Sequence, residues 1–349
     1  MFIFLFMSCA ITINIMIYNV QMFPLIVPGI GEARKPTFTA KARTRQLAEA
    51  DIFGHTDLVV FVEAFDSDLM LWLSKKLSSR FPYRSTPDNE YIGSGIFVVS
   101  RYPLEGQYNE SYPEACGFDK FASKGFKYFK VKSNPEVQII GTHLQAGDPL
   151  CAKGRAESIR RNQIKQIRKF IDRKDKSLGM YVLGDFNFDS SSDEFHDALQ
   201  VLNTKYSPKG DLVYSFDSDK NDYLGMEKSV IANLDFVFEI QDFPQTPNWV
   251  NYILNPKNAK GYKYCNRKLF SYSDHFPVIG TAGEIEYDNS GNVDVCDGID
   301  CGCKNNNCWA YCSVFGPIDV FEWCYTQSKC QADNDCKFNS KCSGRCSFF

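Results

Sequence analysis

Residues 180–187 read Met-Tyr-Val-Leu-Gly-Asp-Phe-Asn, an apolar run of strand length followed at once by two polar side chains, Asp185 and Asn187. On an extended segment these two residues are two positions apart, so their side chains point to the same side. Polar groups at the margin of an apolar strand face partial burial, which is costly unless they are paired or bind a metal ion. The stretch therefore predicts a strand that delivers polar groups to a functional site.

The same pattern recurs along the chain. Other runs with β-branched or aromatic residues and strand length are bounded by polar residues or glycine, and they span residues 13–20, 58–62, 95–99, 126–131, 137–141, 234–238 and 276–280. Polar or ionisable side chains lie at the margins of five of these runs, namely Asn19, Glu63, His143, Asp235, and Asp274 with His275. Together with Asp185 and Asn187 they occupy six places, which we expect to converge on one site.

Helical periodicity predicts a smaller number of helices between the strands. Leu69, Leu73 and Leu77 line one side of one segment, and residues 191–194 resemble a capping box before a third amphipathic segment. The apolar side of a basic helix consists of Ile159, Ile164, Ile167, Phe170 and Ile171. Many strands with fewer helices predict an α+β fold, a sandwich of two β-sheets flanked by helices.

The residue types at the strand ends point to phosphate ester chemistry. Glu63, Asp185, Asn19 and Asn187 offer hard oxygen ligands, which suit magnesium or manganese better than zinc. His275 is a candidate general base because imidazole titrates near neutrality and a carboxylate fixes its tautomer. Its neighbour Asp274 reaches the same site only if the pair lies on a bend. A hard cation with two histidines predicts metal-assisted hydrolysis, and the other two histidines, His55 and His196, are interpreted as structural.

The distribution of cysteines divides the chain into two parts and indicates the cellular compartment of the protein. The 349 residues contain 14 cysteines, ten of them after residue 295, which is typical of a disulfide scaffold made in an oxidising environment. We predict a segment resembling a signal peptide at 1–10, a catalytic domain at 11–287, and a linker with a small cysteine-rich module at 288–349. Bridges are favoured over zinc in the module, but their pairing stays open. The protein is expected to be secreted.

The net charge and the hydropathy of the chain restrict the kinds of molecule with which it can interact. The formal net charge of −3 weakens the case for a nucleic-acid binder that relies on basic charge. No stretch after the N-terminal segment is long and apolar enough to span a membrane. We expect a soluble, secreted monomer.

The ordered blocks Glu63-Ala64-Phe65, 141–146 (Gly-Thr-His-Leu-Gln-Ala), 184–187 (Gly-Asp-Phe-Asn) and Ser273-Asp274-His275, with Asn19 and Leu234-Asp235, resemble the endonuclease/exonuclease/phosphatase superfamily. Within it the chain is most similar to secreted neutral sphingomyelinases of bacterial type. The blocks at 116–119, 123–126 and 147–148 also resemble that branch. The resemblance covers about residues 11–283.

The resemblance implies a deoxyribonuclease-like fold and a magnesium-dependent phosphodiesterase that converts sphingomyelin, or a related choline phospholipid at a membrane surface, to ceramide and phosphocholine. Manganese or cobalt are the expected substitutes. Glu63 would be the principal metal ligand with Asn19 nearby, and His275 would be the general base. Asp185 and Asn187 would position the water and the phosphate, and His143 would bind or protonate a phosphoryl oxygen. Asp235 and Asp274 would support the histidines, while Lys124, Asp119 and Asp148 would contact the substrate. The resemblance also implies a disulfide between Cys116 and Cys151.

Three alternatives stay open. A secreted deoxyribonuclease-like nuclease would share the fold, the metal and the histidines, whereas an inositol-polyphosphate phosphatase is disfavoured because residues 233–236 lack a Cys-Asp-Arg block. A non-catalytic binding protein is the third.

The aromatic residues of 261–265 and 269–272 either lie at a membrane interface or pack in the core.

Overall fold

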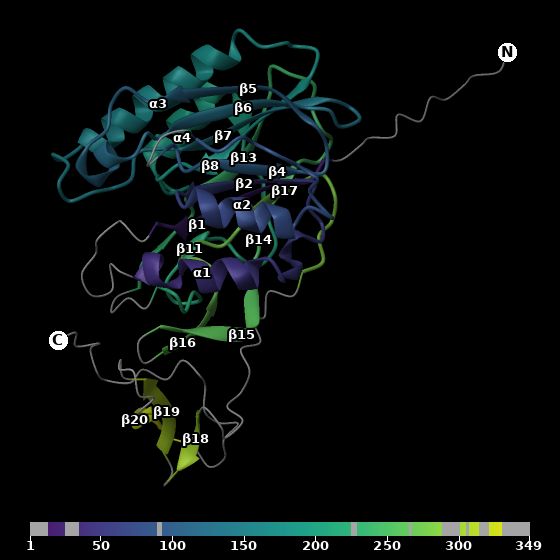
Figure 1. The fold of residues 1–349 in the computed structure, drawn as a ribbon. Coiled ribbons are helices and arrows are strands. Elements are labelled where there is room, and N and C mark those ends of the chain that lie inside the picture. The colour runs from purple at the N-terminus through teal and green to yellow at the C-terminus, as the bar shows by residue number, and fades with distance from the viewer. Residues whose placement is uncertain are drawn as a thin grey trace.

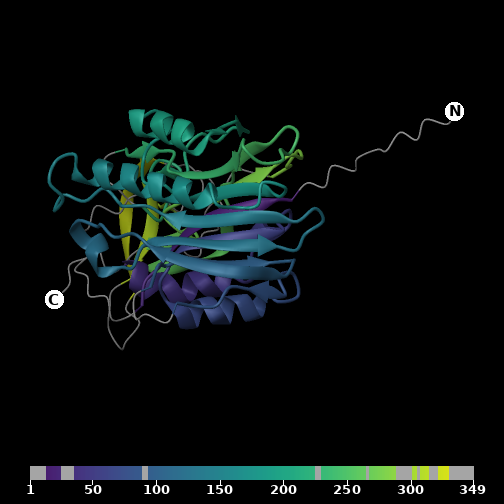
Figure 2. The same cartoon turned by 90° about the horizontal axis from the view of Figure 1, so that it is seen from above.

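The computed structural model describes residues 13–24, 35–88, 93–224, 229–264, 267–287, 301–304, 307–313 and 321–329. Within these residues, two β-sheets lie face to face between two layers of helices (Figure 1). The same layers are visible from a second side in Figure 2, with helices at both outer sides and strands between them. The predicted α+β sandwich flanked by helices is confirmed.

The first sheet has seven strands in the order β10-β14-β17-β1-β2-β4-β3. Its central strands β1 and β2 run parallel, and β17 pairs with β1 in the antiparallel direction. The strand bounds are β1 Ile15–Met22, β2 Leu58–Ala64, β3 Tyr83–Arg84, β4 Phe97–Ser100, β10 Pro208–Lys209, β14 Val250–Ile253 and β17 Val278–Thr281.

The second sheet has six strands in the order β5-β6-β7-β8-β13-β9. Here β7 and β8 are the parallel pair, and β13 runs antiparallel to β8. The strand bounds are β5 Leu104–Ser111, β6 Gly125–Val131, β7 Val137–His143, β8 Gly179–Asp185, β9 Thr204–Lys205 and β13 Asp235–Ile240.

The core between the sheets is built from alternate residues of the central strands. Ile15 and Ile17 of β1 face Ile139 of β7 and Leu183 of β8 in one buried cluster. The intervening residues of β1, Met16 and Tyr18, face the helices on the outer side instead. Both faces of these strands are therefore buried, which explains their continuous apolar runs. Each fully buried aliphatic side chain contributes roughly 1.5–3 kcal/mol, so this core holds the sheets in register.

Four α-helices are present in the described part of the chain. α1 and α2 cover the outer face of the first sheet, and α3 and α4 cover that of the second (Figure 1). Their bounds are α1 Lys35–Leu47, α2 Ser67–Lys76, α3 Arg155–Ile171 and α4 Asp193–Leu202. The three helices predicted from periodicity are confirmed, whereas the sequence pattern did not reveal α1.

One helix start differs in detail from its prediction. The N-cap of α4 is Ser192, whose hydroxyl accepts a hydrogen bond from the amide of Phe195. Glu194 does not reach back to the cap but accepts two hydrogen bonds from Arg160 of α3. The segment therefore has the serine cap of a capping box, while the glutamate joins two helices.

The eight strand-length runs all coincide with strands. Three of these strands extend into the polar residues that follow the apolar run, namely Glu63, His143 and Asp185, and β1 includes Asn19. β17 begins at Val278, later than the apolar pattern predicts, since Pro277 has no amide hydrogen to donate to a ladder.

Smaller elements complete the described residues. The 3₁₀ helices are η2 (Asp51–Phe53) and η3 (Gly117–Phe121), and the hairpins pair β11 (Phe216–Asp217) with β12 (Ile231–Ala232) and β15 (Lys257–Tyr264) with β16 (Arg267–Ser271). In the C-terminal region β18 (Cys301–Lys304), β19 (Asn307–Ser313) and β20 (Phe321–Lys329) form an antiparallel sheet.

The predicted segment 1–10, the linker 288–292 and Cys265 lie outside the described residues. No helix in the described ranges has the length and apolar character needed to cross a bilayer.

Candidate functional site

Three neighbouring strands of the second sheet place three polar side chains in one row. Asp185 at the end of β8 is the register partner of His143 on β7 and of Asp235 on β13. All three side chains are almost completely buried. Gly184 precedes Asp185 because an added Cβ there would lie 2.0 Å from the carbonyl oxygen of Thr142. The tight pairing of β7 with β8 brings His143 and Asp185 to the same edge.

The first sheet supplies Asn19 and Glu63 from the ends of its parallel pair. The pairing of β1 with β2 is irregular between Asn19 and Met22, and such irregularities change the direction of side chains near sites. Glu63 has a positive φ of 54°, a conformation that costs about 1–3 kcal/mol for an ordinary residue. The Asn19 amide donates hydrogen bonds of 3.0 Å to both Glu63 Oε1 and Asp185 Oδ2. Asn19 therefore links the two sheets at the site.

His275 approaches the site from a bend before β17. Its Nδ1 lies 2.7 Å from Asp235 Oδ2, and its Nε2 lies 3.8 Å from Asp185 Oδ2. The bend expected for the Asp274–His275 pair is present. Asp274, however, accepts hydrogen bonds from Gln21 and Ser273 and forms none with either histidine of the site. Of the two aspartates expected to support the histidines, Asp235 is therefore the one that orients the His275 ring.

The charges around His275 oppose the effect of its burial. Burial by itself lowers the pKa of the imidazole, but Asp235, Asp185 and Asp274 together raise that pKa well above 6.5. The hydrogen bond to Asp235 places the Nδ1 proton between the two side chains, so Nε2 is the nitrogen directed toward Asp185. Such an arrangement suits a base that exchanges its proton at Nε2.

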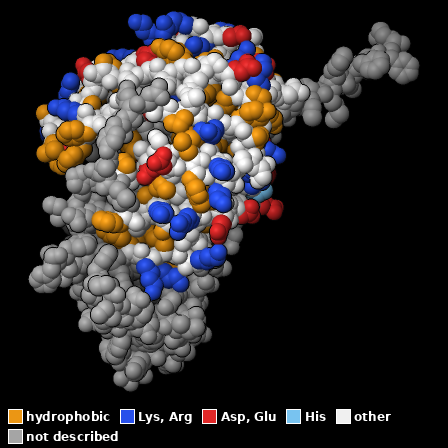
Figure 3. All heavy atoms as spheres, viewed as in Figure 1, with side chains coloured by type: hydrophobic (Ala, Val, Ile, Leu, Met, Phe, Trp, Pro, Cys, Tyr) orange, Lys and Arg blue, Asp and Glu red, His pale blue; other side chains and the backbone are white. Residues whose placement is uncertain are grey.

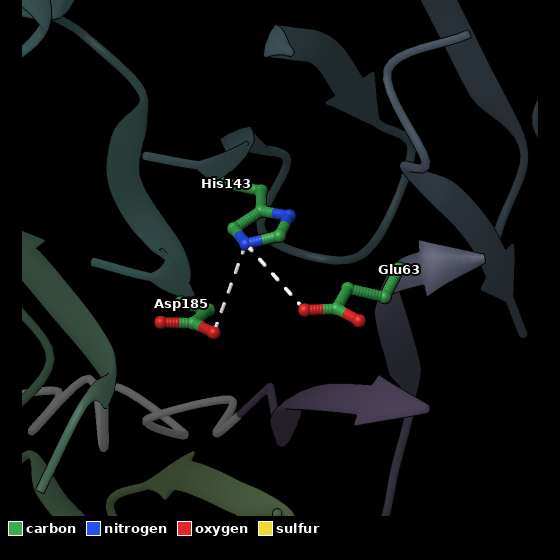
Figure 4. Close-up of side chains that lie close together, drawn as sticks. All are labelled: Glu63, His143 and Asp185. Carbon is green, nitrogen blue, oxygen red and sulfur yellow. Dashed lines mark ion pairs between the residues drawn. The ribbon is translucent and has the colours of Figure 1, made fainter. Parts of the chain in front are cut away.

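Glu63, Asp185 and His143 form a candidate metal centre (Figure 4). Their ligand atoms lie within 4.8 Å of one another, with His143 Nε2 3.9 Å from Glu63 Oε1 and 3.8 Å from Asp185 Oδ2. Burial raises the pKa of Glu63 to about 7 and that of Asp185 to about 6, with repulsion from Asp274 and Asp235 respectively adding to each shift. Two carboxylates destabilised as anions by burial are a donor set that a hard divalent cation fits. The Asn19 side chain turns its amide nitrogen to both carboxylates, while its Oδ1 accepts a hydrogen bond of 3.2 Å from the backbone amide of Gln21.

Lys124 contacts the site directly. Its ammonium group donates to His143 Nε2 at 3.0 Å, to Asp119 Oδ2 at 2.9 Å and to the carbonyl of Leu144 at 3.0 Å. Burial, Lys124 and His275 lower the pKa of His143 well below 6.5, so this ring is neutral and its proton resides on Nδ1. Nδ1 has no hydrogen-bond partner among the described residues. The neutral ring favours the binding role expected for His143 over the protonating one.

The predicted bridge between Cys116 and Cys151 is confirmed. Asp148 lies in the same pair of loops and accepts hydrogen bonds of 2.7 Å from the amides of Phe118 and Leu150. Asp119 accepts from the amide of Ala146 as well as from Lys124. The two aspartates implied to contact substrate are thus engaged in holding the loops beside Lys124.

Asn187 lies at the rim of the row, with a positive φ of 55° that asparagine tolerates. Its amide nitrogen donates to the carbonyl of Leu144, and its backbone amide donates to Asp185 Oδ1. Every site residue predicted from the strand ends is therefore found in one connected cluster.

Two supporting residues were missed from the sequence. Gln21 donates a 2.5 Å hydrogen bond to Asp274, and its position two residues after Asn19 on β1 was the available signal. Arg43 of α1 is fully buried and donates to the carbonyls of Val20, Gln21 and Tyr272. No motif marked Arg43, because its role depends on the packing of α1 against β1.

A family model described as the endonuclease/exonuclease/phosphatase family matches residues 16–252, a span that includes Asn19, Glu63, His143, Asp185 and Asp235. The chain belongs to this family. His275 lies beyond the matched residues, and it joins the site through Asp235.

Curated and solved relatives within the family agree with the match. Sphingomyelinase C of Leptospira interrogans is 27% identical over 365 residues, covering 95% of this chain and 64% of that protein. The crystal structure of sphingomyelinase C from Streptomyces griseocarneus is similar with a TM-score of 0.67 and 25% identity, covering 78% of this chain and 99% of that one. A beta toxin mutant from Staphylococcus aureus, solved with bound magnesium ions, has a TM-score of 0.71 at 24% identity, covering 78% of this chain and 100% of that one. The chain thus spans just under two thirds of the first relative.

The raised pKa of Glu63 predicts that metal binding releases protons. Below about pH 7 this carboxyl is protonated in the metal-free site and must lose its proton to act as a ligand, so magnesium affinity should rise as the pH increases through 7. Calorimetric titrations with magnesium at pH 6.5, in two buffers of different ionisation enthalpy, measure the protons released. A binding enthalpy that is the same in both buffers would contradict this expectation.

Proposed function

We propose that the protein is a magnesium-dependent phosphodiesterase that hydrolyses sphingomyelin to ceramide and phosphocholine. The observation that carries the proposal is the cluster in which Asn19 joins Glu63 to Asp185, while Asp185 lies beside both His143 and the His275–Asp235 pair. The names of the relatives give the substrate class, and the chemistry of the cluster is that of phosphate ester hydrolysis.

In the proposed reaction His275 acts as the general base. Its Nε2 takes a proton from the attacking water, whose oxygen forms a new bond to phosphorus while the phosphorus–oxygen bond to ceramide breaks. Asp235 accepts the Nδ1 proton in a hydrogen bond, which keeps Nε2 aimed at the water and stabilises the imidazolium ring that forms. The departing ceramide oxygen takes up a proton from solvent water, the imidazolium later returns its proton to solvent, and phosphocholine is released.

The remaining residues hold the phosphate and balance charge. Lys124 would supply positive charge beside the phosphate, His143 would line the phosphate position next to it, and Asn187 would help to position the water. Glu63 and Asp185 would hold the magnesium ion, with Asn19 hydrogen-bonded to both, and the ion would neutralise charge on the phosphate and on these carboxylates. Since a base must be neutral before it accepts a proton, charge balance at Asp185 also favours the active form of His275.

Nucleic acid is not the favoured substrate. Lys and Arg side chains gather along the top of the molecule, over α3 in the view of Figure 1 (Figure 3). Three of the α3 arginines, however, form ion pairs with acidic residues: Arg160 with Glu194, Arg161 with Asp197, and Arg168 with Asp172 and Asp242. Paired arginines offer little charge to a phosphate backbone.

A paired assay tests the proposal against a nuclease and against a binding protein. Sphingomyelin and plasmid DNA are incubated side by side with the full chain, with magnesium or with a chelator. We expect release of phosphocholine that requires magnesium, and no DNA cleavage beyond the chelator control. Magnesium-dependent nicking of DNA with inert sphingomyelin would replace the proposal with a nuclease, and the absence of both activities would indicate a binding protein.

A further inference from the structure

Three apolar side chains near the site are unusually exposed. Phe121 is 73% exposed, Leu150 69% and Phe118 68%, which are the largest values for any large hydrophobic side chain in the described ranges. Single exposed apolar residues are common, but a local group of them marks an interaction surface. We call these three residues the apolar platform.

The platform is held together by its own loops. Asp148 accepts one hydrogen bond from the amide of Phe118 and one from the amide of Leu150, so the two residues are tied to the same carboxylate. The Cys116–Cys151 disulfide closes the same pair of loops. Phe118 and Phe121 are three residues apart on the 3₁₀ helix η3, where such side chains lie on one face. Gly117, with a φ of 59°, leaves room for Asp148, since a Cβ there would lie 2.2 Å from its carboxyl carbon. The three side chains are therefore fixed in an exposed position.

A chain of hydrogen bonds connects the platform to the site. Asp119 lies between Phe118 and Phe121 in η3, and its carboxylate accepts a hydrogen bond from Lys124. The same ammonium group contacts His143 Nε2. The platform thus stands at the rim of the site, two side-chain contacts away from His143.

The described residues of the hairpin of β15 and β16 do not offer a comparable surface. Three of its side chains, Tyr262, Tyr264 and Leu269, pack with Tyr223 in one buried cluster. Phe270 is only 2% exposed and Tyr272 only 6%. Of the two alternatives for these aromatics, the described residues support packing in the core.

Two exposed lysines lie beside the platform. Lys120 lies within η3 and Lys153 follows the disulfide, and both are exposed. Neither forms an ion pair with another described residue. Apolar side chains flanked by free ammonium groups match a lipid interface, where acyl chains lie beneath a layer of phosphate groups.

We propose that Phe118, Phe121 and Leu150 dock the protein on a bilayer of choline phospholipids by inserting into its interface beside the catalytic cluster. This inference rests on the proposed function, because it places the site over the lipid that the site would hydrolyse. The partner is the lipid surface itself, and the disulfide and Asp148 keep the inserting side chains in place before contact.

The test compares the double variant Phe118→Ser/Phe121→Ser with the parent chain and with the matched control Phe38→Ser. Phe38 is 56% exposed but lies on α1, in the helix layer of the other sheet. Binding is measured by sedimentation with vesicles of phosphatidylcholine and sphingomyelin, using proteins that also carry His275→Ala so that no lipid is consumed. Hydrolysis by proteins with intact His275 is measured on the same vesicles and on a short-chain sphingomyelin below its critical micelle concentration.

The double variant should bind vesicles and hydrolyse their sphingomyelin about 10- to 100-fold less well, because two phenyl rings no longer leave water. Its turnover of the monomeric substrate should stay within about twofold of the parent, and Phe38→Ser should match the parent throughout. Unchanged vesicle binding would overturn the inference, and so would an equal loss on the monomeric substrate, which would indicate support of the site. A parent that binds vesicles through these residues but hydrolyses neither substrate would overturn the proposed function and leave the docking inference standing.

A second measurement does not depend on removing the phenyl rings. In Phe121→Trp the indole should shift its emission to shorter wavelength on adding vesicles, and lipids brominated near the head of the acyl chain should quench it. An emission spectrum that vesicles leave unchanged would place residue 121 in water and overturn docking through the platform.

Discussion

Replacing His275 with alanine is expected to lower kcat for sphingomyelin by about 1,000-fold, in line with the loss of a positioned general base. The ring is the only imidazole in the described residues that has a carboxylate on Nδ1 and its Nε2 directed toward the carboxylates of the site. Phosphocholine release under saturating magnesium is the measurement. His196→Ala is the matched control, because His196 is an exposed histidine on α4 that should be replaceable without loss.

Two further measurements separate catalysis from structure in this variant. The thermal unfolding midpoint and the magnesium affinity of His275→Ala should remain close to those of the parent, so that the loss appears in kcat. The residual rate should also lose the rise with pH that titration of a base produces. Substantial turnover with the parental pH profile would show that another group accepts the proton.

Replacing Glu63 with glutamine is expected to raise the magnesium concentration needed for half-maximal activity by at least about 100-fold. Loss of a residue behind a metal ligand already costs about 10- to 100-fold in affinity, and Glu63 is proposed as a ligand itself. Glutamine keeps the shape of the side chain and the hydrogen bond that Asn19 donates to Oε1, so the change removes mainly the charge.

Direct magnesium titration by calorimetry gives a readout that does not need turnover. Glu63→Gln should bind the ion weakly and without the proton release expected for the parent. Glu157→Gln, an exposed glutamate on α3, serves as the matched control and should behave as the parent. An unchanged magnesium dependence in Glu63→Gln would remove Glu63 from the metal site.

The predicted strands and their polar ends were recoverable from local pattern alone. Buried strands require continuous apolar residues, and the cost of burying Asn19, Glu63, His143 and Asp185 at their ends makes those residues conspicuous. The Cys116–Cys151 bridge followed from the family resemblance and is present in the structure. Helix α1 was not found, because its amphipathic pattern is weak and its key residue, Arg43, is a buried cation that only its backbone partners explain.

Which residues of the site contact each other was harder to predict than which residues belong to the site. The neighbour of His275 in the chain is Asp274, yet the ring pairs with Asp235, 40 residues away, and Asp274 is held by Gln21 and Ser273. Adjacent residues diverge even on a bend, whereas antiparallel pairing of β13 with β8 brings Asp235 beside Asp185. Lys124 was expected only as a substrate contact, and the structure shows it buried against His143.

The amino-acid sequence by itself determined the central strands of the sandwich, three of its helices, the family and the residue types that meet at its edge, because hydrophobic periodicity and strand-end polarity are local properties of the chain. The tertiary structure alone decided which carboxylate orients His275 and where apolar side chains remain exposed. Those outcomes depend on strand register and on the closure of distant loops, such as the pair that carries Phe118 and Leu150 on Asp148. Contacts between residues far apart in the chain produce no periodic pattern in the amino-acid sequence.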